Sequence, residues 1–382
     1  MQLKLYNNVN LIFINQYNLR KGFAQEGDVL LTHKATIGET AIVPKIEYPY
    51  LMLTPQVTFY RIKDSSKLNN GYLKYYFTSQ TFQKQLKLWS GAGSTRAYIG
   101  ILEQLNLPIE IEEDIAKQQK IATVLSTLDA KIELNNKINT ELEAMAKTLY
   151  DYWFVQFDFP NENGKPYKSS GGEMVWSEEL KRKIPKGWEV ENLKNNSLTS
   201  LIKPSIDFFE GEKTYLATAD VVNNEINFGA DKITFENRES RANMQPIQNS
   251  IWFAKMKNSK KVLYIGEYAD YFLKNFILST GFAGLECKEK CFLEYVWGFI
   301  NNDNFEIIKD RLSNGATQEA INNDSMAFIP LIIPSENILK EYHKKTFEIY
   351  KKIYLNQIEN QKLAELRDFL LPMLMNGQVV VE

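Results

Sequence analysis

The sequence predicts a mixed α/β fold made of two similar domains, each followed by a long helix. Three observations support this prediction. The segment from Gly93 to Ile99 returns as the segment from Gly315 to Ile321, 222 residues further on (315 minus 93). Short apolar runs typical of strands recur in both halves, and two heptad seams predict the long helices. Because solenoid repeats have periods of roughly 20–50 residues, the long offset indicates two copies of a domain-plus-helix unit.

Residues 1–110 are expected to form the first domain. A turn at Gly27-Asp28 precedes the run Val29-Leu30-Leu31, and ranges 40–43 and 57–60 are further β-type runs. This domain has 12 Lys/Arg against 7 Asp/Glu, a net charge of +5 that could attract phosphate groups.

Two long helices are expected over residues 111–157 and 336–376. Each has an apolar seam with residues every third or fourth position, and each seam contains two asparagines. The asparagines are Asn135, Asn139, Asn356 and Asn360. An Asn in an apolar seam costs stability unless it meets a partner, and it often fixes register. We therefore expect the helices to pack on each other, Asn facing Asn, although each helix could instead pack on its own domain. From about Glu113 to Tyr150 the first helix would be roughly 55 Å long at 1.5 Å per residue, and it could act as a ruler between the two domains.

Aromatic residues crowd the end of the first helix. They include Tyr150, Tyr152, Trp153 and Phe154. The cluster is either a core that fixes the helix to the next domain or a docking patch for another protein, since aromatic residues dominate interface hot spots. A linker rich in turn residues is expected over 158–187, followed by a second domain over 188–335 with 15 Lys/Arg against 20 Asp/Glu.

Most enzyme classes lack support in this sequence. It contains no Gly-x-Gly-x-x-Gly after a strand, no phosphate-binding Gly-Lys-Ser/Thr loop, and no Asn/Asp-Pro-Pro-aromatic motif of amino-methyltransferases. The two cysteines and two histidines do not favour a disulfide framework, a metal site or a hydrolytic triad. No apolar run approaches the length of a membrane span, and residues 1–18 lack the layout of a signal peptide. We therefore expect a non-catalytic recognition or scaffold protein in the cytoplasm.

The order of these features resembles the specificity subunit of a Type I restriction-modification system over essentially the whole chain. The residues that carry the resemblance are the repeated Gly-(Ser/Ala)-Thr-(Arg/Gln) motif, the Pro-closed apolar runs, the segment Leu149-Tyr-Asp-Tyr-Trp-Phe-Val-Gln-Phe157 and Pro185-Lys-Gly-Trp188. The resemblance implies two target-recognition domains that read the halves of a split double-stranded DNA site for phage defence. It also implies an antiparallel coiled coil with pseudo-two-fold symmetry, docking of methylation subunits, and a restriction motor-nuclease subunit. S-adenosylmethionine, ATP and Mg would then bind the partner subunits, not this chain.

The first domain departs from this pattern. If the two units were equal, it would lack about 34 opening residues, since the second opens near Trp188 and 188 minus 222 is −34. The chain could accordingly be an inactive exchange copy of a specificity subunit, and a protein-only scaffold is a further alternative.

The expected DNA contacts are polar or basic residues in loops, because phosphates and base edges are bound by such groups. They are Thr32, His33, Lys34, Thr36, Ser94, Thr95, Arg96, Arg238, Arg241, Lys255, Lys257 and Gln318. Each could instead lie in an ordinary solvated or structural turn. Lys260 and Lys261 would complete a local basic patch with Lys255 and Lys257.

Overall fold

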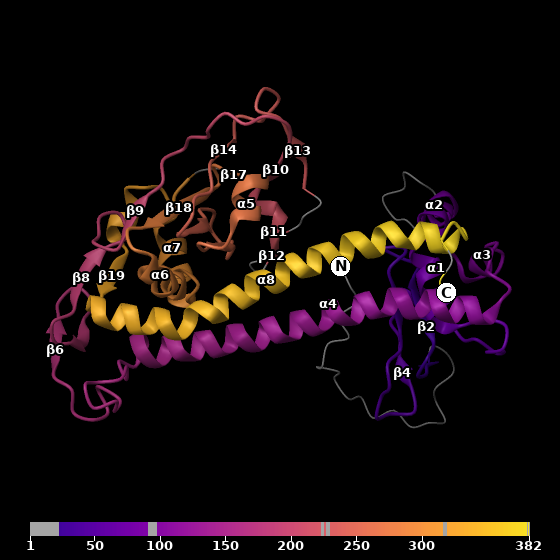
Figure 1. The fold of residues 1–382 in the computed structure, drawn as a ribbon, viewed down its shortest axis with the longest axis horizontal. Helices are drawn as coiled ribbons and strands as arrows, with labels where there is room; N and C mark the ends of the chain where they lie inside the picture. The colour runs from indigo at the N-terminus through magenta and orange to yellow at the C-terminus, as the bar shows by residue number, and fades with distance from the viewer. Residues whose placement is uncertain are drawn as a thin grey trace. The chain divides into compact units, whose positions relative to one another are not determined.

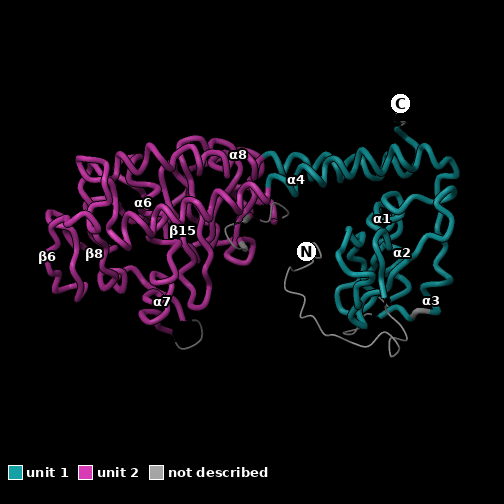
Figure 2. Tube along the Cα trace, turned by 90° about the horizontal axis from the view of Figure 1, so that it is seen from below, with its two compact units in different colours: residues 1–135, 359–382 teal, residues 136–358 magenta. Residues whose placement is uncertain are grey.

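The computed structural model describes residues 23–90, 98–222, 225–226, 230–315, 319–379 and 381. The chain forms two compact units. Unit 1 contains residues 1–135 and 359–382, and unit 2 contains residues 136–358 (Figure 2). Unit 1 is therefore discontinuous in sequence, because it combines the first third of the chain with its last residues.

Unit 1 is a small mixed α/β domain (Figure 1). Its strands are β1 (Phe23–Ala24), β2 (Val29–Thr32), β3 (Thr40–Ile42), β4 (Leu51–Met52) and β5 (Val57–Tyr60). Its short helices are α1 (Asn70–Thr78), α2 (Gln80–Trp89) and α3 (Ile101–Leu105). The central sheet is antiparallel with the order β3-β2-β5, and buried residues of β2 pack against apolar side chains of α1 and α2. Asn69 caps α1, since its side chain accepts a hydrogen bond from the backbone N–H of Tyr72 at 3.0 Å.

Two long helices contribute residues to both units. They are α4 (Ile115–Tyr150) and α8 (Glu336–Met375). In unit 1, Asn135 Nδ2 donates to Asn360 Oδ1 at 2.9 Å, and in unit 2 Asn356 Nδ2 donates to Asn139 Oδ1 at 2.8 Å. In unit 1, Arg367 Nη1 also donates to Asp129 Oδ1 at 2.9 Å, so partner numbers fall along α8 as they rise along α4 and the two helices are antiparallel there. The predicted pairing of the two helices is confirmed.

Unit 2 contains the second mixed α/β domain, which confirms the predicted fold class. Its strands are β6 (Met174–Ser177), β7 (Arg182–Pro185), β8 (Glu189–Asn192), β9 (Thr199–Leu201), β10 (Lys213–Leu216), β11 (Val221–Val222), β12 (Glu225–Ile226), β13 (Lys232–Ile233), β14 (Ala242–Met244), β15 (Ser250–Ala254), β16 (Val262–Ile265), β17 (Phe276–Ser279), β18 (Phe282–Cys287) and β19 (Pro330–Ile333). Its helices besides the long pair are η2 (Asp151–Val155), η3 (Thr218–Asp220), α5 (Asp270–Asn275), η4 (Lys290–Phe292), α6 (Leu293–Ile300), α7 (Asp303–Leu312) and η5 (Ser325–Phe328).

Two four-stranded sheets organise unit 2. Their orders are β16-β15-β18-β9 and β13-β10-β17-β14, and β10 and β17 are parallel. The segment expected to be a linker, residues 158–187, includes the antiparallel hairpin of β6 and β7. Turn residues such as Gly171 and Lys181, both with positive φ, are therefore parts of a structured connection.

The sequence repeat corresponds to a repeated hairpin. In β2–β3, Leu31 faces Thr40, and in β15–β16 Phe253 faces Val262. Both members of the second pair lie 222 residues after those of the first, so the two hairpins have the same register. The helices α2 and α7 that follow are also alike, with ten residues each.

Candidate nucleic-acid interface

The turn between β2 and β3 is held closed by the backbone and by Thr32. The backbone N–H of Glu39 donates to Thr32 Oγ1 at 2.9 Å, and the N–H of Gly38 donates to the Thr32 carbonyl at 3.0 Å. Gly38 has a φ of 96°, which glycine adopts readily. The closed turn leaves the side chains of Lys34 and Thr36 exposed.

Thr32 and His33 have a different environment from their neighbours, because both are buried. His33 Nδ1 lies 2.8 Å from Thr58 Oγ1, and burial, with a further contribution from Lys34, lowers the pKa of its imidazole. The hydrogen bonds of these two buried side chains stabilise the turn. Their burial leaves Lys34 and Thr36 as the accessible DNA-contact candidates of this turn.

A second segment lies against this turn. Lys34 and Tyr98 form an isolated antiparallel bridge, and the N–H of Ile99 donates to the His33 carbonyl at 3.1 Å. The candidates Ser94, Thr95 and Arg96 precede Tyr98 and lie outside the described residues. Tyr98 itself is 48% exposed, with its ring 5.8 Å from that of His33. Sequence reasoning did not select this tyrosine, although it lies within the repeated segment, next to Ile99.

Unit 2 has the same arrangement. Met256 and Ala320 form an isolated antiparallel bridge, and the N–H of Ile321 donates to the Lys255 carbonyl at 2.9 Å. All four residues lie 222 positions after their counterparts in unit 1. Each unit thus brings together the two loop regions that the sequence identified separately. The candidate Gln318 lies outside the described residues.

The lysines near this second turn are largely engaged within the protein. Lys257 Nζ lies 2.6 Å from Glu319, and Lys260 Nζ lies 2.6 Å from Asp303. Lys261 Nζ donates to the Thr218 carbonyl, and burial lowers the pKa of the half-buried Lys255. The predicted basic patch is therefore partly neutralised, and a phosphate would have to compete with acidic side chains for Lys257 and Lys260.

Arg241 borders the same region. The Arg241 carbonyl accepts a hydrogen bond from the N–H of Thr280 at 2.8 Å. The residue after Thr280 is Gly281, and its carbonyl accepts a hydrogen bond from the N–H of Lys255 at 2.9 Å. The Arg241 side chain is exposed. Arg238 is half-buried, stacks on the Phe235 ring at 4.1 Å and donates to the Phe235 carbonyl. Arg241 is accordingly the more available of the two guanidinium groups.

Three of the four aromatic docking candidates lie inside unit 2. Tyr150, Trp153 and Phe154 are buried, and Phe154 packs edge-on against Tyr342 of α8 with ring centroids 4.8 Å apart. These three rings fit the alternative of a core cluster that fixes the helix to the second domain, because all three are buried. Tyr152 is 37% exposed and stays accessible.

The packing of this cluster depends on a glycine. A Cβ at Gly298, in α6, would overlap the ring of Tyr150. Glycine here lets α6 approach the end of α4 closely.

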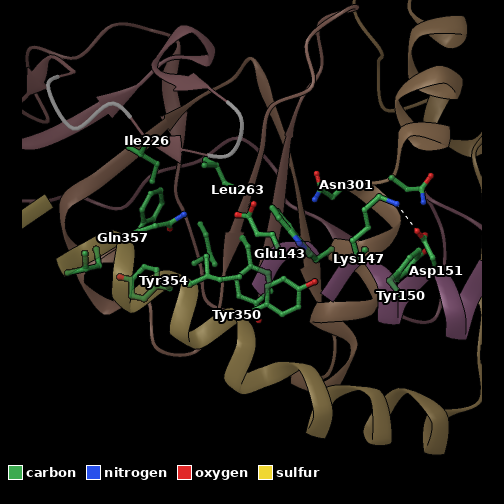
Figure 3. Close-up of a pocket in the computed structure, with 18 residues that line it drawn as sticks. Glu143, Lys147, Tyr150, Asp151, Ile226, Leu263, Asn301, Tyr350, Tyr354 and Gln357 are labelled. Carbon is green, nitrogen blue, oxygen red and sulfur yellow. Dashed lines mark hydrogen bonds and ion pairs between the residues drawn. The ribbon is translucent and has the colours of Figure 1, made fainter. Parts of the chain in front are cut away.

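A cavity of about 110 Å³ lies beside these aromatic residues in unit 2. Figure 3 shows its lining, in which Tyr350 and Tyr354 come from α8, while Glu143 and Lys147 come from α4. The Lys147 ammonium is 2.6 Å from the Asp151 carboxylate, so this cation is already paired. The mostly apolar lining suits an apolar group better than a nucleic-acid backbone.

Within the described residues, no group of three or more His, Cys, Asp or Glu side chains is placed to hold a metal ion. Over the same part of the chain, every helix is too short or too polar to cross a membrane.

The fold and the site define a duplicated binding protein, with one loop pair in each unit and a shared pair of long helices. Comparisons with known proteins specify the class. Residues 3–144 match the family model described as the Type I restriction modification DNA specificity domain. The specificity subunit of the Type I restriction enzyme MjaIX from Methanocaldococcus jannaschii is 28% identical, over 94% of this chain and 78% of that protein.

A second relative is also a specificity subunit, and a solved structure has the same fold. The specificity subunit of the Type I restriction enzyme HindI from Haemophilus influenzae is 26% identical, over 72% of this chain and 69% of that protein. The crystal structure of a Type I restriction-modification S subunit from M. genitalium has the same fold, with a TM-score of 0.52 and 15% identity over 93% of this chain and 84% of that one.

Over most of its length this chain is therefore similar to specificity subunits of Type I restriction enzymes, and its residues 3–144 match their DNA specificity domain, in agreement with the resemblance stated from the sequence. Both relatives are named as specificity subunits of Type I restriction enzymes, which agrees with the expectation of a recognition subunit.

Proposed function

We propose that this chain reads a bipartite, asymmetric DNA site, with one half read by the loop pair of each unit. The observation that carries the proposal is the identical bridge in the two copies, Lys34 with Tyr98 and Met256 with Ala320. A duplicated backbone platform with different exposed side chains can read two different sequences. Asymmetry of the target follows from those differences.

The accessible groups at each loop pair fit the two parts of DNA recognition. Lys34 and Thr36 in unit 1, and Arg241 in unit 2, can contact phosphate oxygens or base edges. The exposed ring of Tyr98 adds an apolar surface beside Lys34. The loops containing Ser94, Thr95, Arg96 and Gln318 stay part of this proposal.

We further propose that the two long helices set the spacing of the half-sites. The helices contain 36 and 40 residues, or about 54 and 60 Å at 1.5 Å per residue. Both half-sites would share one face of B-DNA if their centres were about 34–36 Å apart, which predicts a non-specific spacer of several base pairs. Inserting one heptad into both helices should change the preferred spacer. An unchanged spacer would refute the ruler.

The chemistry would belong to partner subunits. We propose that methylation subunits and a restriction motor-nuclease subunit assemble on this chain, and that S-adenosylmethionine, ATP and Mg bind to them. Tyr152 is the exposed member of the four expected docking residues, and we propose that it contacts a partner subunit.

The test is co-expression of this chain with its methylation subunits, followed by sequencing of the host DNA for modified adenines. Methylation at one split motif, absent when this chain is omitted, is the expected result. A stable complex that methylates no such motif would refute the proposal.

A protein-only scaffold is the second candidate, and the ion pairs of Lys257 and Lys260 with acidic residues favour it. The salt dependence of DNA binding distinguishes the two functions, because phosphate contacts release counterions. A scaffold would show no salt-dependent binding of DNA.

A further inference from the structure

Lys309, in α7, is a lysine in the core of unit 2. Its side chain is 1% exposed, and Nζ donates to the carbonyls of Ala254 at 3.2 Å, Met256 at 3.0 Å and Ser259 at 3.0 Å. The carboxylate of Glu306 lies 2.6 Å from the same ammonium. A buried ammonium is costly unless it is paired and hydrogen-bonded. Lys309 meets both conditions, and three carbonyls match the three donors of an ammonium.

The fold itself does not need a lysine at this position. Helices α2 and α7 are both ten residues long, and each has a buried Phe at its third residue, Phe82 and Phe305. The seventh residue is Leu86 in α2 and Lys309 in α7, and each is 1% exposed. A leucine therefore fills the corresponding core position in the sister domain. The charge must have another purpose in unit 2.

Two of these carbonyls, those of Met256 and Ser259, belong to the turn between β15 and β16, and the third, that of Ala254, is at the end of β15 where the turn begins. Lys309 thus holds this turn at its start, near its middle and near its end. The next residue of α7, Asp310, accepts a hydrogen bond from the N–H of Asn258 at 3.0 Å. Asn258 has a φ of 54°, so the turn contains a left-handed residue that the carboxylate helps to hold.

In unit 1 the corresponding turn, between β2 and β3, accepts a hydrogen bond from a neutral side chain of α2. Gln83 Nε2 donates to the Gly38 carbonyl at 2.8 Å and to the Phe77 carbonyl at 2.7 Å. A side chain of the corresponding helix thus binds the hairpin turn in both units, but only unit 2 uses a buried charge. The turn of unit 2 contains Lys255 and Lys257, two of the expected DNA contacts.

We propose that Lys309 is a positioning residue for DNA recognition by unit 2, because its buried ammonium fixes the path of the turn over residues 255–261. The inference rests on the proposed function and deepens it. Lys309 does not touch DNA, since its ammonium is buried and its donors are used within the protein. It determines specificity through the groups that the turn presents.

The test compares Lys309→Leu, which copies the sister domain, with Lys309→Met, which keeps the aliphatic stem. Arg311→Leu is the matched control, because Arg311 is exposed on the same helix. Hydrogen exchange of the full chain should accelerate at least about tenfold over residues 255–261 in both Lys309 variants, and not in the control. Unchanged exchange in both variants would overturn the inference.

The second measurement uses the complex with methylation subunits and host DNA sequencing. Discrimination at one half-site should fall at least about fivefold in the Lys309 variants, while the other half-site keeps its specificity. Equal losses at both half-sites would show a merely structural role, and no loss at either would overturn the specificity role. Failure of the proposed function would appear separately, as a wild-type chain that directs no methylation. The exchange measurement would still decide whether Lys309 holds the turn.

Discussion

Replacing both Asn139 and Asn356 by leucine should stabilise unit 2 relative to either single replacement. Both side chains are buried in the helix pair, and Asn356 Nδ2 donates to Asn139 Oδ1 at 2.8 Å. Asn356 Oδ1 is buried without a hydrogen-bond partner. Leucine has a similar branched shape, so the double variant continues the apolar seam without a large change in volume.

The size of the difference in free energy of unfolding depends on which buried polar atoms keep no hydrogen-bond partner in each variant. Asn356→Leu alone removes the donor and leaves the buried Asn139 amide unpaired, at a cost of about 1–3 kcal/mol. The double variant loses one hydrogen bond, worth about 1 kcal/mol net, and removes every unpaired amide of the pair. It should therefore exceed the Asn356 single variant by about 1–3 kcal/mol in free energy of unfolding. Lys137→Leu, at an exposed position of α4, controls for adding a leucine to this helix.

Thermal melting of the full chain measures the difference, at about 2–4 °C per kcal/mol for a unit of this size. The double variant should melt several degrees above the single variants. The same variant should lose register fidelity, because an Asn in an apolar seam excludes shifted pairings. Disulfide trapping with cysteines placed across the seam would detect shifted registers. A double variant that melts below both single variants would refute the reasoning. The hydrogen bond between Asn139 and Asn356 would then stabilise unit 2 by more than the cost of burying the two amides.

Three further predictions concern other parts of the chain. Gly298→Ala should lower the free energy of unfolding by about 1–3 kcal/mol, because the added Cβ overlaps the Tyr150 ring; melting that matches the wild type would contradict this. Burial works to raise the pKa of Asp129, but hydrogen bonds, including one from Lys74 at 2.7 Å, outweigh it and hold the pKa below its usual value. The stability from this carboxylate should therefore be present above about pH 3.9 and be lost as the pH falls through its folded pKa. Acid titration of Asp129→Asn by circular dichroism should show a shallower loss than the wild type, and equal slopes would exclude the effect. Lys34→Ala should weaken DNA binding at all sequences and reduce the salt slope by about 1, and an unchanged slope would show that Lys34 contacts no phosphate.

The large features of this fold could be predicted from sequence because they are encoded by periodic patterns. The 222-residue repeat predicted two domains, and the heptad seams predicted the paired helices. The asparagine pairs were visible as polar positions within those seams, since one helix position follows another at a fixed angle.

The site could be predicted only in part, because burial of a polar side chain depends on contacts that are distant in sequence. His33 looks like a solvated loop residue until Thr58 and Tyr98 are placed beside it. Lys309 reads as an ordinary lysine in the last turn of a helix, where a positive charge is favourable in any case. Only the fold shows that three carbonyls of another element surround it. The 222-residue offset sets Leu86 against Ile308, and only the positions within α2 and α7, which are one residue out of that offset, set Leu86 against Lys309.

The discontinuity of unit 1 has a consequence for how the chain is made. Leu371 and Leu374 of α8 belong to the same hydrophobic cluster as Tyr72 and Leu125, so the core of the N-terminal unit is completed by residues 359–382. During synthesis the first 135 residues must wait for some 220 more before this core can close. Unit 2, which is continuous, can fold in the meantime and bring its two ends together, shortening the loop that must be closed. A premature stop in the last part of the reading frame would thus damage the domain at the opposite end of the chain, and a half-made subunit would carry an open apolar surface for as long as the ribosome needs to finish.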